Sequence, residues 1–91
     1  MSKKSKTIQI INKRGLHARA SAKFVKLAET FSETLEVTKD GMTVCGTSIM
    51  GLMLLAAASG DYIHVSCEGP GSENALIEIE ALINNRFEEE I

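Results

Sequence analysis

The chain has 91 residues, enough for one domain with a single core and too few for two. Hydrophobic residues make up 44% of it and charged residues 24%, the balance of an ordinary globular protein. The formal charge of −2 provides no strongly positive field for phosphate backbones, so we expect no nucleic-acid partner. No apolar run could span a membrane and no signal-peptide pattern is present, which predicts a cytoplasmic protein without a membrane partner.

The first part of the chain predicts a strand and a helix. Polar and apolar residues alternate over 7–12, the period of two that is typical of a half-buried strand. From about Ala18, apolar and small residues recur at helical spacing, so we expect a helix that begins just after His17. We expect one domain over 1–91, with the lysine-rich residues 1–5 as a flexible tail.

A hairpin and a second helix are predicted next. Two alternating runs, 35–38 and 42–45, flank an Asp-Gly pair, which is a strong hairpin signal. Ser48 can accept a hydrogen bond from the first turn of a short apolar helix over 49–57.

The last part of the chain predicts a strand over 62–68 and a third helix. Ser72 is a suitable N-cap for this helix, whose apolar stripe extends to Phe87. The predicted order is therefore βαββαβα. Four strands and three helices can share one core only if the helices cover one face of the sheet, so we expect an α+β open-faced sandwich.

The segment 15–19, Gly-Leu-His-Ala-Arg, has the residues of a phosphoryl site. Free N–H groups at a helix start favour an anion, and Arg19 can donate charge-assisted hydrogen bonds to phosphoryl oxygens. The positive end of the helix dipole favours the neutral, nucleophilic form of His17. Taken alone the spacing is a weak indication, because a histidine near a helix start more often caps or packs than reacts.

Two segments resemble the signature regions of the HPr family of phosphocarrier proteins in the phosphoenolpyruvate-dependent phosphotransferase system. One is 15–19 followed by Lys-Phe-Val at 23–25, and the other is Ser-Ile-Met-Gly at 48–51. The likeness covers nearly the whole chain beyond the first five or six residues. It implies an HPr-like fold, with a four-stranded antiparallel sheet in the order 1-4-2-3 and three helices on one face.

The resemblance also implies a function. His17 would accept a phosphoryl group on Nδ1 from Enzyme I, which is itself charged from phosphoenolpyruvate, and pass it to an Enzyme IIA-type protein. Arg19 matches the phosphate-stabilising arginine of the family. Such a protein is a carrier rather than an enzyme and needs no cofactor or metal; we expect it to be a monomer.

Three further features of the sequence bear on this resemblance. Ser48 matches the serine that HPr kinase/phosphorylase modifies in many members, although a helix cap alone explains it equally well. Ala20 stands where the family usually has proline, which affects the local rigidity of the site. The His-Ala-Arg motif at 17–19 and the Phe-Glu-Glu-Glu sequence at 87–90 resemble those of nitrogen-branch relatives more than those of sugar-branch relatives.

The resemblance places the partner-docking surface on the first and second helices. The segment 49–57 holds more apolar surface than one side of a short helix can bury, although about half of it can be explained as core. Flexible methionines suit a surface that accepts several partners. The residues that we expect to dock partners are Ala18, Ala22, Ile49, Met50 and Met53.

Two other classes of function fit the sequence less well. An RNA-binding α/β module has similar layers but needs exposed aromatic residues on its sheet, and the predicted strands offer only Tyr62. A regulatory binding protein of the same fold would not transfer phosphoryl groups, and the presence of both His17 and Arg19 argues against it.

The remaining histidine and the cysteines predict no site. His64 falls on the polar side of a strand, with no helix terminus or arginine beside it. A metal site from His64 and Cys67 is excluded because residues three apart in a strand point to opposite faces. Cys45 and Cys67 face opposite ways in strands that the family's sheet order separates, so we expect two free thiols.

Overall fold

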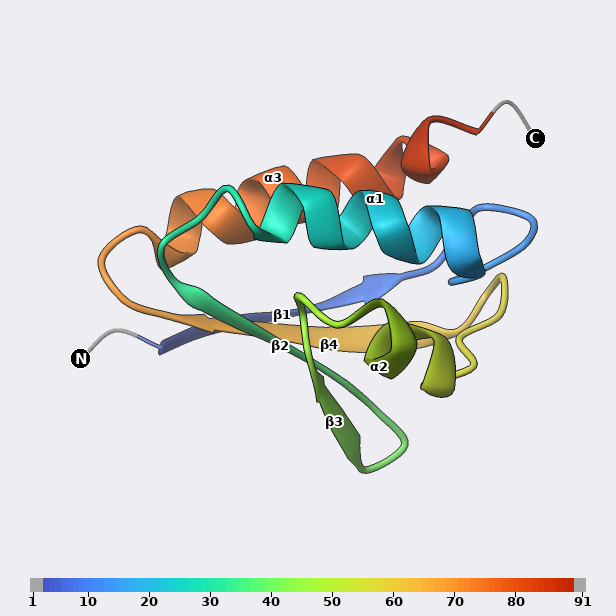
Figure 1. Ribbon diagram of the computed structural model, residues 1–91, viewed down its shortest axis with the longest axis horizontal. Helices are drawn as coiled ribbons and strands as arrows, with labels where there is room; N and C mark the ends of the chain where they lie inside the picture. The colour runs from blue at the N-terminus through green and yellow to red at the C-terminus, as the bar shows by residue number, and fades with distance from the viewer. Residues whose placement is uncertain (1–2, 90–91) are drawn as a thin grey trace.

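The computed structural model describes residues 3–89 and has the predicted element order (Figure 1). The strands form one antiparallel sheet in the order β1-β4-β2-β3. The α+β open-faced sandwich and its sheet order are thus confirmed. The elements are β1 (Lys3–Gln9), α1 (Ala18–Ala28), β2 (Thr34–Lys39), β3 (Met42–Cys45), α2 (Ile49–Leu54), β4 (Tyr62–Glu68), α3 (Ser72–Asn84) and the short 3-10 turn η1 (Arg86–Glu88).

The core lies between the sheet and the two longer helices. In Figure 1, α1 and α3 run along one face of the sheet, while the shorter α2 packs against α1 and β3. Phe24 of α1 and Ile79 of α3 are fully buried against this face, as are Ile63 and Val65 of β4. The alternate residue His64 is exposed on the opposite face, so the period-two pattern of β4 reflects one covered and one open side.

β1 starts earlier than its alternation predicts. It covers Lys3–Gln9 rather than 7–12, and the pairs Lys3 to Glu68, Lys4 to Cys67 and Ser5 to Ser66 join it to β4. The flexible tail predicted over residues 1–5 is therefore wrong for Lys3 to Ser5, while residues 1 and 2 lie outside the described residues. β1 is an edge strand, where backbone hydrogen bonds suffice for pairing and lysines are common on the exposed side.

The hairpin between β2 and β3 has the predicted turn. Asp40 and Gly41 have positive φ angles of 51° and 82°, the conformation that a two-residue turn of the I′ type requires at both central positions. This turn sets a register in which Val37 lies opposite Val44.

The second and third helices differ from the predicted boundaries. α2 ends at Leu54 rather than near Ala57, because Ala56 adopts a left-handed φ of 53° and turns the chain towards β4. α3 has Gly71 as its N-cap, one residue before the predicted Ser72. Among the described residues no side chain caps α3, and the Gly71 N–H donates instead to the Glu33 carboxylate at 2.9 Å, which ties the start of the helix to the segment before β2.

Phe87 lies beyond the third helix, although its place in the apolar stripe predicted it within. α3 ends at Asn84, and the next residues Arg86, Phe87 and Glu88 all have left-handed φ angles of 53° to 67°. The chain therefore reverses direction after α3, as Figure 1 shows above α1. This reversal buries Phe87 completely and brings Glu89 to His17 at the start of α1.

The predictions for the cysteines and for His64 agree with the structure. Cys45 is exposed and Cys67 is buried, both are free, and β2 separates their strands. His64 lies on the open face of the sheet, where its Nδ1 is 3.1 Å from the hydroxyl of Thr7. Within residues 3–89, no helix combines the length and apolarity needed to cross a membrane.

Candidate functional site

His17 is the N-cap of α1, as predicted. Its backbone is extended, with φ −77° and ψ −177°, and its carbonyl accepts the first helical hydrogen bond from Ser21 N–H at 2.9 Å. The imidazole makes no capping bond. Within the described part of the chain, no acceptor is found for the N–H groups of Ala18, Arg19 and Ala20, so three free donors open the helix beside the imidazole.

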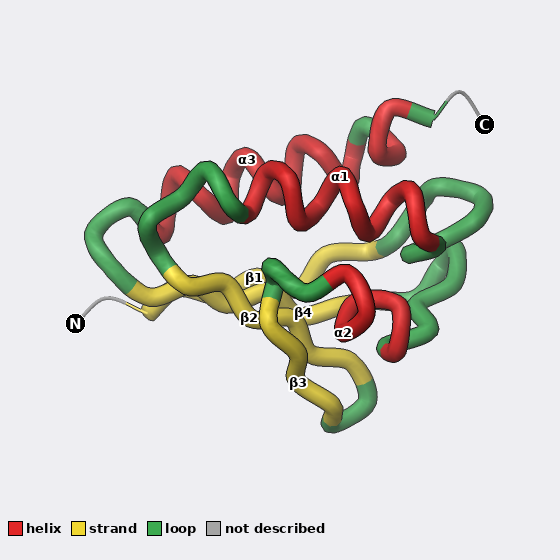
Figure 2. Tube along the Cα trace, in the orientation of Figure 1, coloured by secondary structure: helices red, strands yellow, loops and turns green. Residues whose placement is uncertain are grey.

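The loop before His17 is fastened to the connection between α2 and β4. Leu16 N–H donates to the carbonyl of Ala57 at 2.9 Å, and the Leu16 side chain is buried. Gly15 has a φ of +67°, and a Cβ added there would lie 2.3 Å from the same carbonyl. Figure 2 shows both loops at one end of the molecule, beside the start of α1. Glycine is thus required two residues before the histidine.

The carboxylate of Glu89 contacts the imidazole directly. Its Oε2 lies 2.5 Å from Nε2 of His17, and its Oε1 accepts a hydrogen bond of 3.1 Å from Nδ2 of Asn12. The buried Asn12 also donates to the Gly15 carbonyl at 2.9 Å, which joins the C-terminal segment to the loop before the histidine. The His17 and Glu89 side chains are only 16% and 10% exposed, so solvent screens this contact weakly.

The charge state of Glu89 decides which atom carries the shared proton. Burial raises the pKa of Glu89, but hydrogen bonds from His17 and Asn12, together with the charges of His17 and Arg19, outweigh it and hold the pKa below its usual value. Glu89 is therefore ionised near neutral pH and can only accept. The hydrogen lies on Nε2 of His17, and within residues 3–89 no hydrogen bond engages Nδ1.

Arg19 is exposed on the first turn of α1. Among the residues that the structure describes, its guanidinium makes no hydrogen bond or ion pair, yet its charge helps to lower the pKa of Glu89. The guanidinium is therefore near the His17 site and free to bind an anion. Ala20, at the position where proline was expected, is the third helical residue and is fully buried.

Ser48 is the N-cap of α2, as predicted. Its Oγ accepts a hydrogen bond of 2.9 Å from Gly51 N–H. The cap explains Ser48 structurally.

An apolar surface formed by α1 and α2 lies next to the histidine. Ala18 and Ala22 are exposed on α1, which packs against α2. Met50 and Leu54 are about two-thirds exposed, and Ile49 and Met53 are also exposed. Only Leu52 and Leu55 of the large apolar residues over 49–55 are buried, so less of this run belongs to the core than the predicted half. We call this surface the apolar docking surface, because the resemblance predicts that partners dock here. It consists of the exposed residues Ala18, Ala22, Ile49, Met50 and Met53, which were predicted to dock partners, and of Leu54, which was not.

The model of one protein family matches most of the chain. The model described as "PTS HPr component phosphorylation site" matches residues 4–85, most of the chain. The chain belongs to the HPr family. HPr proteins are phosphoryl carriers of the phosphotransferase system, and this is the general function of the chain.

Individual HPr proteins are similar over nearly their whole length. The phosphocarrier protein HPr of Neisseria meningitidis serogroup A is 48% identical over 83 residues, which cover 91% of this chain and 93% of the relative. HPr of Cupriavidus necator is 46% identical over 80 residues, covering 88% and 90%. The crystal structure of HPr-C-His from Thermoanaerobacter tengcongensis superposes with a TM-score of 0.92 at 43% identity, covering 97% and 99%.

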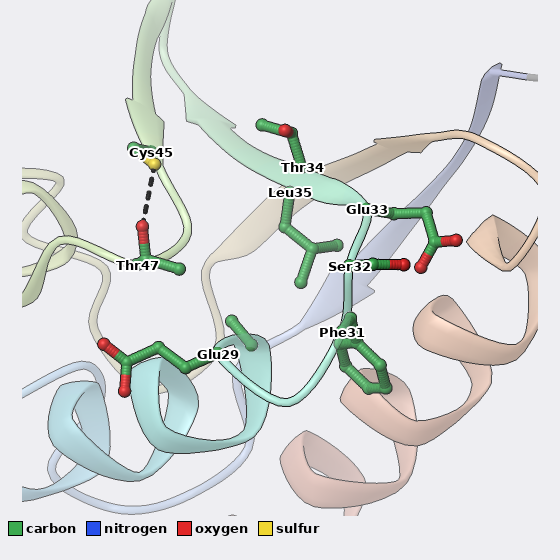
Figure 3. Close-up of a pocket in the computed structure, with 9 residues that line it drawn as sticks. Glu29, Phe31, Ser32, Glu33, Thr34, Leu35, Cys45 and Thr47 are labelled. Atoms are coloured by element: carbon green, nitrogen blue, oxygen red, sulfur yellow. Dashed lines mark hydrogen bonds between the residues drawn. The ribbon is translucent and has the colours of Figure 1, made fainter.

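A surface pocket at the other end of α1 does not suit the chemistry of an HPr protein. Ala28 and Glu29 at the end of α1 line it together with β2 and β3 (Figure 3). The Glu29 and Glu33 carboxylates in its wall would repel a phosphoryl group. A hydrogen bond between Cys45 Sγ and Thr47 Oγ1, 3.0 Å apart, lowers the pKa of the Cys45 thiol. Within residues 3–89, no group of three or more His, Cys, Asp or Glu side chains could hold a metal ion.

The sequence predicted His17, Arg19 and Ser48 but did not predict Glu89 or Asn12. The glutamates over 88–90 resemble the ending of nitrogen-branch relatives, and that likeness does not indicate a contact with His17. The one sequence signal for their role was a large apolar residue, Phe87, directly before them, which could anchor the segment.

Proposed function

We propose that this HPr protein accepts a phosphoryl group on Nδ1 of His17 from phosphorylated Enzyme I and transfers it to an Enzyme IIA-type protein. The observation that carries the proposal is an imidazole whose Nδ1 is unengaged, beside the free donors that open α1 and an unpaired Arg19 within the described residues. We place this relay in the cytoplasm, where phosphoenolpyruvate is made.

The geometry supports both uptake and release of the group. The Nδ1 lone pair forms the P–N bond while the bond from phosphorus to the donor breaks and its electron pair stays with the donor. The N–H groups of Ala18 to Ala20 and the Arg19 guanidinium can then bind the phosphoryl oxygens. Ala18 and Arg19 are exposed and His17 is partly exposed, so a second protein can reach the phosphorus for the next transfer.

His64 does not offer such a site. It lies on the open face of the sheet, its Nδ1 is within hydrogen-bond distance of Thr7, and it belongs to a strand rather than a helix terminus. We therefore propose His17 as the sole acceptor.

The apolar docking surface supports the assignment of partners. Enzyme I and the Enzyme IIA-type protein must both approach His17, and exposed methionines can repack against different partners. We propose that both proteins bind here in turn.

We also propose that Ser48 is a regulatory phosphorylation site for an HPr kinase/phosphorylase. Ser48 opens α2, so a phosphate on its hydroxyl would stand at the edge of the apolar docking surface. Two negative charges there would have to be desolvated when a partner binds, which weakens docking.

Ser48→Asp is expected to weaken Enzyme I binding without unfolding the protein. Aspartate still caps α2, but it adds a negative charge beside the apolar docking surface. The concentration of Enzyme I at half-maximal transfer should rise roughly tenfold, which corresponds to about 1.4 kcal/mol of docking free energy. Steady-state transfer kinetics measure this.

Ser48→Asn is the matched control, because asparagine caps as well as aspartate and carries no charge. It should leave the half-saturating concentration near that of the natural chain. Equal affinities for all three proteins would show that Enzyme I does not bind next to α2.

We propose that the chain serves the nitrogen branch, because its His-Ala-Arg motif at 17–19 and its glutamate-rich sequence at 87–90 resemble those of nitrogen-branch relatives. Purified phospho-protein offered to a nitrogen-branch and to a sugar-branch Enzyme IIA should transfer faster to the former. Faster transfer to the sugar-branch protein would assign the other branch.

The test of the main proposal is phosphorylation from phosphoenolpyruvate. The chain, incubated with catalytic Enzyme I and phosphoenolpyruvate, should gain the mass of one phosphoryl group, measured on the intact protein. Addition of an Enzyme IIA-type protein should then return it to its original mass. No gain in mass would contradict phosphoryl transfer and favour a regulatory binding role for this fold.

A further inference from the structure

The segment over residues 86–89 meets the imidazole of His17 at Nε2, the ring nitrogen that the proposed phosphoryl transfer does not use. Phe87 is completely buried and anchors this segment, and its carbonyl accepts a hydrogen bond of 2.9 Å from Lys23 Nζ. The same lysine pairs with the Glu88 carboxylate at 3.2 Å. The buried Phe87 ring and the hydrogen bond to its carbonyl hold the chain against α1 immediately before Glu89, whereas the pair with the exposed Glu88 carboxylate adds little.

The backbone of the segment is in an uncommon conformation. Arg86, Phe87 and Glu88 have φ angles of 57°, 53° and 67°, a region that residues other than glycine rarely occupy. Such strain persists only where surrounding contacts over-determine it, and it is frequent at functional sites. Here it reverses the chain after α3 and brings a carboxylate to an imidazole 72 positions away in the sequence.

We propose that Glu89 is a positioning residue for phosphoryl transfer: by accepting the Nε2–H of His17 it orients the ring and keeps Nδ1 free to attack phosphorus. The inference rests on the proposed role of His17 as acceptor. Asn12 is part of the arrangement, because it holds the second carboxylate oxygen at 3.1 Å and so fixes which oxygen faces the ring.

The contact favours transfer in both directions. Nδ1 and Nε2 lie on opposite sides of the imidazole, so a phosphoryl group on Nδ1 and a carboxylate at Nε2 do not compete for one position. When Nδ1 attacks, a P–N bond forms, the bond from phosphorus to the Enzyme I donor breaks, and the ring keeps its hydrogen on Nε2. The ring then carries a positive charge, which the Glu89 carboxylate offsets. Transfer onward reverses these changes with an Enzyme IIA-type acceptor.

The test compares Glu89→Gln with Glu88→Gln. Both variants remove one negative charge from adjacent positions of the same segment, but Glu88 is 65% exposed and pairs with Lys23 instead of His17. A glutamine at 89 keeps the size of the side chain, yet its amide can donate as well as accept. It therefore permits the tautomer with hydrogen on Nδ1, which has no lone pair for attack.

Two measurements are made on each protein. Nitrogen-15 spectra of the imidazole, at a pH where the ring is neutral, report which nitrogen carries the hydrogen. Transfer from phospho-Enzyme I gives the rate at saturation and the half-saturating concentration separately. We expect the natural chain and Glu88→Gln to hold the hydrogen on Nε2 and to transfer at equal rates.

Glu89→Gln should show a share of the Nδ1-protonated tautomer and a saturating rate about tenfold lower, the effect of losing one charge-assisted hydrogen bond. Its half-saturating concentration should not change, because the apolar docking surface is intact. An unchanged tautomer, or equal saturating rates for the two variants, overturns the inference while labelling of the natural chain upholds the proposed function. A natural chain that takes no phosphoryl group overturns both.

Discussion

The His17→Ala protein is expected to take up no phosphoryl group from phosphoenolpyruvate and Enzyme I. Alanine removes the only imidazole that combines an unengaged Nδ1 with a helix start and a nearby guanidinium. Loss of labelling should be complete, measured by intact mass, because no other side chain in the sequence offers that combination. The His17 side chain does not cap α1, so we expect the variant to fold and to lose about 1 kcal/mol or less of stability.

His64→Ala is the control for histidine chemistry in general. It removes an exposed imidazole on the far face of the sheet, so labelling should proceed as in the natural chain. The group on the natural chain should also be lost in acid, as expected of a P–N bond to imidazole and not of a serine phosphate. Full labelling of His17→Ala would contradict the proposed acceptor and direct attention to Ser48 or His64.

The order of elements could be predicted from the sequence because its signals are local. Alternation over 62–68, the Asp-Gly turn at Asp40 and Gly41, and the helical spacing after His17 each depend on neighbours within a few residues. Such patterns report which side of an element meets the core, whatever the rest of the fold. Sheet order came instead from the resemblance, since pairing between distant strands leaves no local signal.

The residues at which helices and strands begin and end were harder to predict from the sequence, because long-range contacts determine them. α2 ends at Leu54 before the left-handed Ala56, and the next carbonyl, that of Ala57, accepts from the distant Leu16 N–H. The N-cap of α3 is Gly71, whose N–H donates to the distant Glu33 carboxylate. β1 extends back to Lys3 through backbone pairing that requires no apolar side chain.

The candidate site was predicted only in part for the same reason. His17 and Arg19 are two residues apart, so their relation to the helix start could be inferred from spacing. Glu89 reaches the site through three successive left-handed residues, none of them glycine, which no propensity rule anticipates. Contacts of this kind depend on where Phe87 finds space in the core.

Gly15→Ala is expected to cause a large loss of stability together with slower phosphoryl transfer. The added Cβ would lie 2.3 Å from the Ala57 carbonyl oxygen and 2.9 Å from Ala58 Cα, so backbone must move. The left-handed φ of +67° costs about 1–2 kcal/mol for a residue with a Cβ, and overpacking adds about 1–3 kcal/mol. For a domain of this size, the melting temperature should fall by about 10 °C or more.

The comparison that isolates the close approach is Gly41→Ala. Gly41 also has a left-handed φ, of +82°, but a Cβ there meets nothing within 4 Å. The Gly41→Ala protein should lose only about 1 kcal/mol of folding free energy, through backbone strain alone. It should transfer phosphoryl groups at the normal rate. Thermal unfolding and single-turnover transfer on both variants measure the two effects separately.

In Gly15→Ala the hydrogen bond from Leu16 to Ala57 must lengthen, which moves His17 away from its helix-start donors. The saturating rate should therefore fall even at temperatures where the variant is fully folded. If Gly15→Ala were as stable and as active as Gly41→Ala, the loop before His17 would not depend on its contact with Ala57, and the histidine would have to be positioned by α1 and Glu89 alone.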